Sequence, residues 1–199
     1  LLPVAGKPLI QYHIENLAAL GVLEIVINLA WKAEQLRDVL GDGLQFGTRI
    51  LYSDEGDAAL ETGGGIFKAL PMLGTEPLLV ISGDVWTDYP LARLMPFPAT
   101  GDVAHFVVVA NPDFHTRGDF GLANGRLTRG GKRLTYANIG MFRPEFFGAC
   151  SPGKFPLAPL MYEWIDRGRV SGELYEGRWR NVGTPAQLGE LDKLLRAGD

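Results

Sequence analysis

Short apolar runs alternate with helical segments along the first half of the chain, and this alternation constrains the fold more than any other feature. Residues 23–28, 48–52 and 77–81 are apolar runs with the length of buried strands. Apolar residues recur at helical spacing in the segments before and between these runs, at 8–20, 33–40 and 66–70. We therefore predict an α/β domain with a largely parallel sheet.

The pattern changes after Asp102. Longer strands are predicted at 103–109 and 134–142, followed by a helix at 156–167, a strand at 170–175 and a closing helix at 184–196. No linker, low-complexity tract or internal repeat separates the two parts. We expect a single domain over residues 1–199 with two halves, 1–100 and 101–199.

Composition argues against several kinds of partner. The formal net charge is −4, with Lys and Arg spread along the chain, so a nucleic acid polymer is not expected to bind. No apolar run approaches the roughly 20 residues of a membrane span. Cys150 is the only cysteine, which excludes an internal disulfide and fits a reducing cytoplasm. Because the chain opens at Leu1 without Met, we expect the natural protein to have residues before it.

An aspartate follows the most apolar of these runs, in the sequence Leu78-Leu79-Val80-Ile81-Ser82-Gly83-Asp84. Open α/β sheets bind ligands at the carboxyl ends of their strands, and Gly83 would let a ligand approach the backbone. The Asp84 carboxylate suits Mg²⁺, which prefers oxygen ligands and substrate phosphates. Gly-Asp is also a common turn pair, so a purely structural role stays open.

Three consecutive glycines precede the helical segment at 66–70, in Leu60-Glu61-Thr62-Gly63-Gly64-Gly65-Ile66. Glycines entering a helix expose backbone N–H groups and let a base or a phosphate approach the main chain. Because glycine is a poor helix former, a triplet there calls for a reason. The alternative is a flexible surface loop.

A third motif, Trp179-Arg180-Asn181-Val182-Gly183-Thr184-Pro185, lies near the end of the chain. Thr184 is placed as an N-cap and Pro185 as a first helical residue. Local capping explains these two residues and leaves Asn181 without a role.

Taken in order along the chain, these motifs resemble the sugar-1-phosphate nucleotidyltransferase family. Residues 2–10, Leu-Pro-Val-Ala-Gly-Lys-Pro-Leu-Ile, are similar to the segment that follows this family's signature loop. Residues 60–70 and 83–89 are most similar to the N-acetylmuramate 1-phosphate uridylyltransferases of peptidoglycan recycling. The resemblance implies a Rossmann-like, three-layer α/β/α (GT-A-like) fold with a mostly parallel mixed central sheet.

The resemblance also implies a role for each motif. The substrates would be a nucleoside triphosphate and a sugar 1-phosphate. The narrower resemblance implies UTP and N-acetylmuramate 1-phosphate. The first half would bind the nucleotide and the second half the sugar. Mg²⁺ would be held by Asp84, also the catalytic residue, and by Asn181. The implied nucleotide-binding residues are Glu61, Thr62, Gly63, Gly64 and Gly83, and the implied sugar-binding residues are Gly121, Asn138, Gly140 and Glu173.

The sequence departs from the family in two places. The signature loop, which grips the triphosphate, is absent, so the 199-residue chain is expected to be inactive or severely impaired. The family usually has an aspartate where this chain has Asn181, and an amide oxygen brings no negative charge to a metal.

Other functions remain open from sequence. A guanylyl- or thymidylyltransferase acting on mannose or glucose 1-phosphate is an alternative within the class, and an inactive nucleotide-sugar sensor is one outside it. A dinucleotide-binding dehydrogenase domain is disfavoured, because no Gly-x-Gly-x-x-Gly follows a strand. We expect a monomer or a small homo-oligomer.

Overall fold

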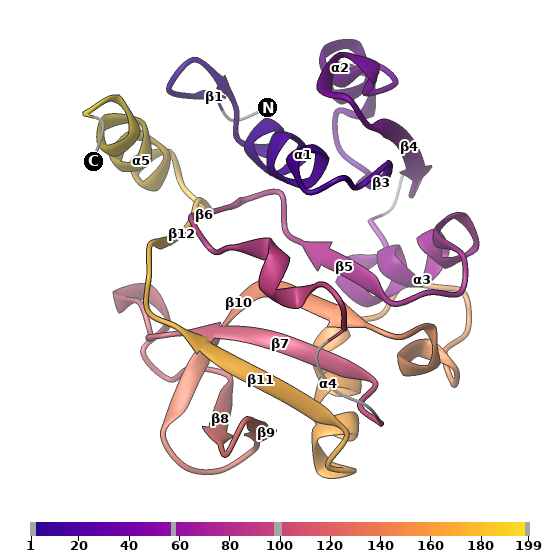
Figure 1. Cartoon of the computed structure of the whole chain (residues 1–199), viewed down its shortest axis with the longest axis vertical. Coiled ribbons are helices and arrows are strands. Elements are labelled where there is room, and N and C mark those ends of the chain that lie inside the picture. The colour runs from indigo at the N-terminus through magenta and orange to yellow at the C-terminus, as the bar shows by residue number, and fades with distance from the viewer. Residues whose placement is uncertain (1–2, 57–58, 98–100, 198–199) are drawn as a thin grey trace.

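The computed structural model describes residues 3–56, 59–97 and 101–197, and its largest element is a mixed six-stranded sheet (Figure 1). The strands lie in the order β5-β10-β7-β11-β9-β8. Their bounds are β5 (Leu78–Ile81), β7 (Ala104–Val109), β8 (Phe120–Ala123), β9 (Arg126–Thr128), β10 (Arg133–Phe142) and β11 (Val170–Tyr175).

Three two-stranded ladders lie beside this sheet. β3 (Glu24–Leu29) pairs in parallel with β4 (Arg49–Asp54). β6 (Val85–Thr87) pairs antiparallel with β12 (Trp179–Asn181), and β1 (Pro3–Val4) pairs antiparallel with β2 (Lys7–Pro8). The β6–β12 pair joins the end of the first half of the chain to the end of the second.

The described residues also form five α-helices and four short 3₁₀ helices. The α-helices are α1 (Leu9–Ala19), α2 (Ala33–Leu40), α3 (Glu61–Leu73), α4 (Leu157–Asp166) and α5 (Pro185–Arg196), and the 3₁₀ helices are η1 (Leu44–Phe46), η2 (Leu91–Leu94), η3 (Asp113–His115) and η4 (Pro144–Phe147). Thr184 caps α5 as expected, its hydroxyl accepting from the Gln187 N–H at 3.3 Å. Among the described residues, the helices are too short or too polar to span a membrane.

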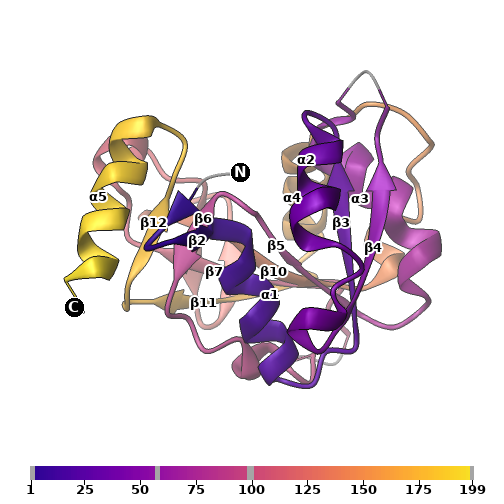
Figure 2. The ribbon, with the colours of Figure 1, turned by 90° about the horizontal axis from the view of Figure 1, so that it is seen from above.

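Both faces of the six-stranded sheet are covered. On one face, Phe106 and Phe142 pack with apolar residues of α3 and α4, such as Ile66 and Met161. On the other face, residues of β6 and η2 such as Leu94 pack against β7 and β10. Helices α1 and α2 cover the β3–β4 pair, and α5 packs beside β1 (Figure 2). The two halves of the chain are therefore interleaved.

The α/β class and the mixed central sheet agree with the prediction, but the sheet is less parallel than expected. Among the described strands of the six-stranded sheet, only β11 and β7 pair in parallel. The long strand β10 runs antiparallel to β5, β7 and β8. The sequence misled here because an apolar run indicates that a strand is buried and carries no information about its direction.

Candidate active site

Asp84 lies in the turn that connects β5 to β6. Two backbone hydrogen bonds fix the turn. The Ser82 N–H donates to the Asn138 carbonyl at 3.0 Å, and the Val85 N–H donates to the Ser82 carbonyl at 3.3 Å. Gly83 and Asp84 themselves are exposed. The backbone is thus anchored on β10 while the carboxylate faces solvent.

Asn181 lies directly beside this turn. In the β6–β12 ladder Asn181 is paired with Val85, and the Val182 N–H donates to the Asp84 carbonyl at 2.7 Å. In the part of the chain that the structure describes, neither the Asp84 carboxylate nor the Asn181 amide makes a side-chain hydrogen bond or ion pair. The ladder therefore brings the backbones of two residues that are far apart in sequence close together, and both side chains are without such a partner among the described residues.

His13, on α1, supports the same turn from the buried side. Its Nε2 lies 2.6 Å from the Val85 carbonyl, and its side chain is buried. Burial lowers the pKa of His13 below its usual range, although the Val85 carbonyl and the Asp84 carboxylate each raise it in part. A neutral ring that donates to Val85 fits this environment. His13 is accordingly a support for the backbone next to Asp84.

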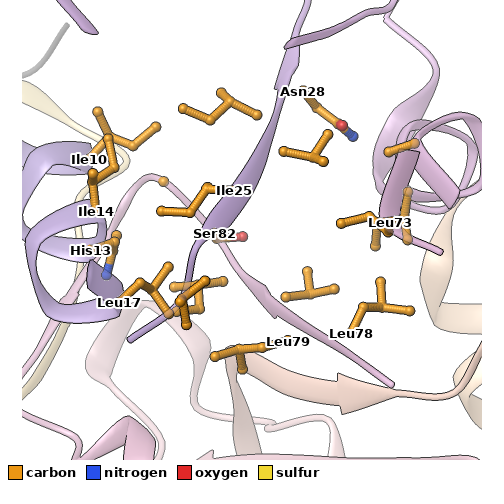
Figure 3. Close-up of a pocket in the computed structure, with 18 of the residues that line it drawn as sticks. Ile10, His13, Ile14, Leu17, Ile25, Asn28, Leu73, Leu78, Leu79 and Ser82 are labelled. Carbon is orange, nitrogen blue, oxygen red and sulfur yellow. The ribbon is translucent and has the colours of Figure 1, made fainter. Parts of the chain in front are cut away.

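Gly83 lines one cavity and Asn181 lines another. The larger, of about 880 Å³, lies between α1, β3, α3 and β5, and Gly83 is part of its lining (Figure 3). The smaller, of about 290 Å³, is lined by Asn181 and by residues of β10, η3 and α4. The β6–β12 ladder and the turn before it therefore connect Gly83 of one cavity to Asn181 of the other, although Asp84 itself lines neither. Such an arrangement can hold two small molecules with their reacting groups close together.

Part of the lining of the larger cavity is polar. Glu61 and Thr62, both exposed at the start of α3, lie there with Ser82, Asn28 and Glu55. The backbone of Glu61 has φ +59°, a left-handed conformation that is uncommon for a residue other than glycine. Such outliers gather at functional sites because the surrounding structure must hold them in place.

The glycine triplet does not stand open to a ligand as the sequence suggested. Helix α3 starts at Glu61, ahead of the glycines, and encloses all three in its first turns. A Cβ on Gly63 would lie 2.5 Å from the Phe155 ring, and one on Gly64 would lie 2.2 Å from the Gly153 carbonyl oxygen. The Gly64 N–H already donates to the Phe155 carbonyl at 3.1 Å. These glycines let residues 153–155 pack against the helix, which local sequence could not reveal.

Asn138 is the one predicted sugar-binding residue that lines the smaller cavity among the described residues. It has φ +58°, and the register of β10 against β7 shifts between Tyr136 and Gly140, around this residue. A bulge of this kind redirects a side chain out of the regular ladder. Asn138 lines the smaller cavity together with Asn181.

The structure places Gly121, Gly140 and Glu173 differently, because none of them lines the smaller cavity. A Cβ on Gly121 would lie 1.9 Å from the Gly130 carbonyl oxygen, and one on Gly140 would lie 2.9 Å from the Phe106 ring. Glu173 accepts from the Tyr89 hydroxyl and from Arg93, the latter at 2.6 Å. Packing and ion pairing are the contacts that these three residues make among the described residues, and a role in sugar binding stays a prediction for them.

Sequence reasoning missed a polar pair at the smaller cavity. His115 and Asp119 line it, with His115 Nε2 3.0 Å from Asp119 Oδ1. Asp119 also accepts from the Tyr136 N–H at 2.8 Å, which ties the pair to β10. The available signal was the segment Gly118-Asp119-Phe120-Gly121, of which only Gly121 was predicted to bind the sugar.

Comparison with known proteins defines the class. The family model described as nucleotidyl transferase matches residues 1–129. The chain belongs to the nucleotidyl transferase family.

Individual proteins of this family are similar to nearly the whole chain. The chain is 42% identical over 208 aligned residues to the N-acetylmuramate alpha-1-phosphate uridylyltransferase of Neisseria meningitidis serogroup B, covering 99% of this chain and 89% of the relative. It is 34% identical to the enzyme of the same name from Caulobacter vibrioides, covering 99% and 88% of the two chains. Among the solved structures, the inositol-1-phosphate CTP transferase of T. maritima has a TM-score of 0.76 at 16% identity, covering 98% of this chain and 86% of that one, which shows a shared fold.

Proposed function

We propose that the natural protein joins UTP to N-acetylmuramate 1-phosphate, forming the uridine-diphosphate sugar and releasing pyrophosphate. The observation that supports the proposal is the pairing of β6 with β12, which places Asn181 opposite Val85 and the Val182 N–H on the Asp84 carbonyl. The choice of base and sugar follows the two relatives of that name, which match nearly the whole chain.

The reaction needs positioning more than proton transfer. An oxygen of the sugar phosphate attacks the α-phosphorus of the triphosphate in line, the bond from that phosphorus to the bridging oxygen breaks, and pyrophosphate leaves with the bonding electrons. The attacking oxygen is already an anion, so no general base is required, and His13 is left in its supporting role. Rate acceleration would come from alignment of the two substrates and from neutralisation of their charge.

The two cavities divide the substrates between them. Glu61, Thr62 and Gly83 line the larger cavity and would contact the nucleotide there. Gly63 and Gly64 would act through the backbone, by allowing α3 to begin where it does. Asn138 would contact the sugar in the smaller cavity, where His115 and Asp119 are further polar partners.

The residues at the turn fit Mg²⁺ shared with substrate phosphates. Among the described residues, no group of three or more His, Cys, Asp or Glu side chains could enclose a metal by itself. One carboxylate, from Asp84, and one amide, from Asn181, are nonetheless a typical protein contribution to a Mg²⁺ that also binds phosphate oxygens. When bound, the ion would neutralise negative charge on the substrate phosphates. Nothing in the reaction requires an oxidising compartment, in keeping with the cytoplasmic location expected from the single cysteine.

The substrate choice is tested with a panel of triphosphates and sugar 1-phosphates, using the natural full-length protein with Mg²⁺ and measuring pyrophosphate release. We expect the highest kcat/KM with UTP and N-acetylmuramate 1-phosphate. Faster turnover of GTP or dTTP with mannose or glucose 1-phosphate would instead place the protein among the guanylyl- or thymidylyltransferases.

A sensor function is the alternative that Asn181 favours, since an amide contributes less charge to a metal than the usual aspartate. Calorimetry measures binding of the nucleotide sugar, and pyrophosphate release measures turnover. Comparing the two measurements separates the two functions. A sensor binds without releasing pyrophosphate under any substrate combination.

A further inference from the structure

A loop that is tied to the sheet forms part of the wall of the smaller cavity. Residues 111–119 connect β7 to β8, and the Asn111 side-chain oxygen accepts from the Thr135 hydroxyl of β10 at 2.9 Å. Two side chains of this loop, Phe114 and His115, line the cavity. Phe114 is exposed and His115 is half-buried. The loop is therefore held in place while it presents uncovered side chains to the cavity.

Asp119 orients His115 within this wall. One carboxylate oxygen of Asp119 lies 3.0 Å from His115 Nε2, and the other accepts from the Tyr136 N–H at 2.8 Å. The side chains of His115 and Asp119 are 39% and 32% exposed, and an exposed ion pair of this kind contributes little to stability. The second ring nitrogen of His115, Nδ1, has no hydrogen-bond partner among the described residues. The ring is thus fixed by one nitrogen and can bind a ligand with the other.

The charge of the cavity wall narrows the kind of ligand. Its described lining contains no lysine or arginine, and His115 is the only lining side chain there that can carry a positive charge. Asp119 is the only acidic one. An anionic group on a ligand would meet the Asp119 carboxylate, and an anion withdrawn from water needs an opposite charge beside it. Among the described lining residues, His115 can supply that charge.

We propose that His115 selects a sugar 1-phosphate that also carries a carboxylate, and that Asp119 is its positioning residue. This inference rests on the proposed function and deepens it. N-acetylmuramate is N-acetylglucosamine with a lactyl ether on O3, and the ether ends in a carboxylate. Protonated on both nitrogens, His115 donates from Nε2 to Asp119 and from Nδ1 to the sugar carboxylate. The phosphate of the same sugar binds toward Asn181, which also lines this cavity.

The test compares two sugar phosphates that differ only in the lactyl ether, N-acetylmuramate 1-phosphate and N-acetylglucosamine 1-phosphate, with UTP, Mg²⁺ and the natural full-length protein. His115→Gln keeps a hydrogen-bonding side chain that cannot become charged. We expect its kcat/KM for N-acetylmuramate 1-phosphate to fall about 10- to 100-fold, the factor typical of losing a hydrogen bond to a charged group. The value for N-acetylglucosamine 1-phosphate should change by less than about 3-fold, since that sugar has no carboxylate to lose a partner. Calorimetric Kd values of the two sugar phosphates give the same comparison where turnover is slow.

Three further variants separate charge, positioning and general effects. His115→Arg keeps a positive charge, so its preference between the sugars should lie closer to that of wild type than to that of His115→Gln. Asp119→Asn leaves one acceptor oxygen for two donors and should reduce the same preference. Arg117→Gln is the matched control, because Arg117 is an exposed cation of the same loop outside the described cavity lining. Both sugars should react with it as they do with wild type.

Three results would overturn the proposal. Equal losses for the two sugars in His115→Gln would make His115 a general contact or a structural residue. Unchanged kinetics in His115→Gln would remove it from sugar recognition. A selective loss in Arg117→Gln alone would assign the carboxylate to that residue. Each of these differs from failure of the proposed function, in which the wild-type protein itself does not turn over N-acetylmuramate 1-phosphate and both proposals fall.

Discussion

Asp84 is the residue on which the proposed chemistry depends most. It is exposed and makes no side-chain hydrogen bond or ion pair with the described residues, so Asp84→Asn removes a charge with little disturbance of packing. We expect kcat to fall roughly 100- to 1,000-fold, the cost typical of losing one electrostatic contact in a transition state. The free energy of unfolding should change by less than about 0.5 kcal/mol. Pyrophosphate release and denaturant unfolding measure the two effects.

Asp38→Asn is the matched control for this variant, because Asp38 is an exposed carboxylate on α2, outside both the β5–β6 turn and the β6–β12 ladder. Both activity and stability should be unchanged in it. Near wild-type turnover of Asp84→Asn would remove the carboxylate from the proposed mechanism.

Asn181 can be changed in the opposite sense. Asn181→Asp adds a carboxylate beside Asp84, and two carboxylates attract a divalent cation more strongly than a carboxylate and an amide do. We expect half-maximal activity at a lower Mg²⁺ concentration. An unchanged Mg²⁺ dependence would show that position 181 lies outside the metal's ligand set.

His13 makes stability depend on pH. Burial lowers its pKa in the folded protein, so the unfolded chain binds the proton more tightly. The contribution of His13 to the free energy of unfolding is therefore fully present above about pH 6.5, the pKa of histidine in the unfolded chain, and is lost as the pH falls below that value. The slope from this residue is at most about 1.4 kcal/mol per pH unit.

His13→Gln should reduce that slope, because an amide N–H can replace the bond to the Val85 carbonyl without titrating. Denaturant unfolding at pH 5, 6 and 7 measures the difference. Some dependence should persist, since burial also lowers the pKa of His105. Identical slopes in wild type and variant would refute this role of His13.

At the scale of elements, α3 depends on the close approach of residues 153–155. Gly64→Ala would place a methyl group 2.2 Å from the Gly153 carbonyl oxygen, a backbone atom that cannot rotate away. We expect the free energy of unfolding to fall by about 1–3 kcal/mol. Gly189→Ala in α5 is the control, since no atom lies within 4 Å of its added Cβ. It should stabilise the protein by about 0.5–1 kcal/mol, and equal effects of the two substitutions would argue against the packing explanation.

At the scale of the whole molecule, α5 ties the end of the chain to its beginning. Leu191 is buried against Val4, Leu9 and Trp86, and Asp192 accepts from the Ala5 N–H at 2.7 Å. Leu191→Ala should lower the free energy of unfolding by about 2–5 kcal/mol. Leu44→Ala, at a side chain that is 72% exposed, should change it by less than about 0.5 kcal/mol. Urea midpoints measure both, and a similar midpoint shift in the two variants would mean that α5 is not part of the cooperative core.

Local patterns were sufficient for most elements of this molecule. The helix predicted at 33–40 and the strand predicted at 170–175 have those bounds in the structure, because their apolar spacing and flanking residues are local properties. The ordered motifs were also sufficient for the family, and the family comparison confirms it. What the sequence by itself determined is therefore the α/β class, the family and the residues from which a site could be built.

Only the tertiary structure decided how those residues meet. The pairing of β6 with β12 sets Asp84 beside Asn181, residues 153–155 enclose the glycines of α3, and a bulge in β10 turns Asn138 toward the smaller cavity. The direction of each strand is likewise decided by the tertiary structure, as is the lack of a described partner strand on one edge of β3 and of β5. Each of these features is a contact between segments distant in the chain. Periodicity and capping report a residue's immediate neighbours, whereas such contacts depend on how the whole chain packs.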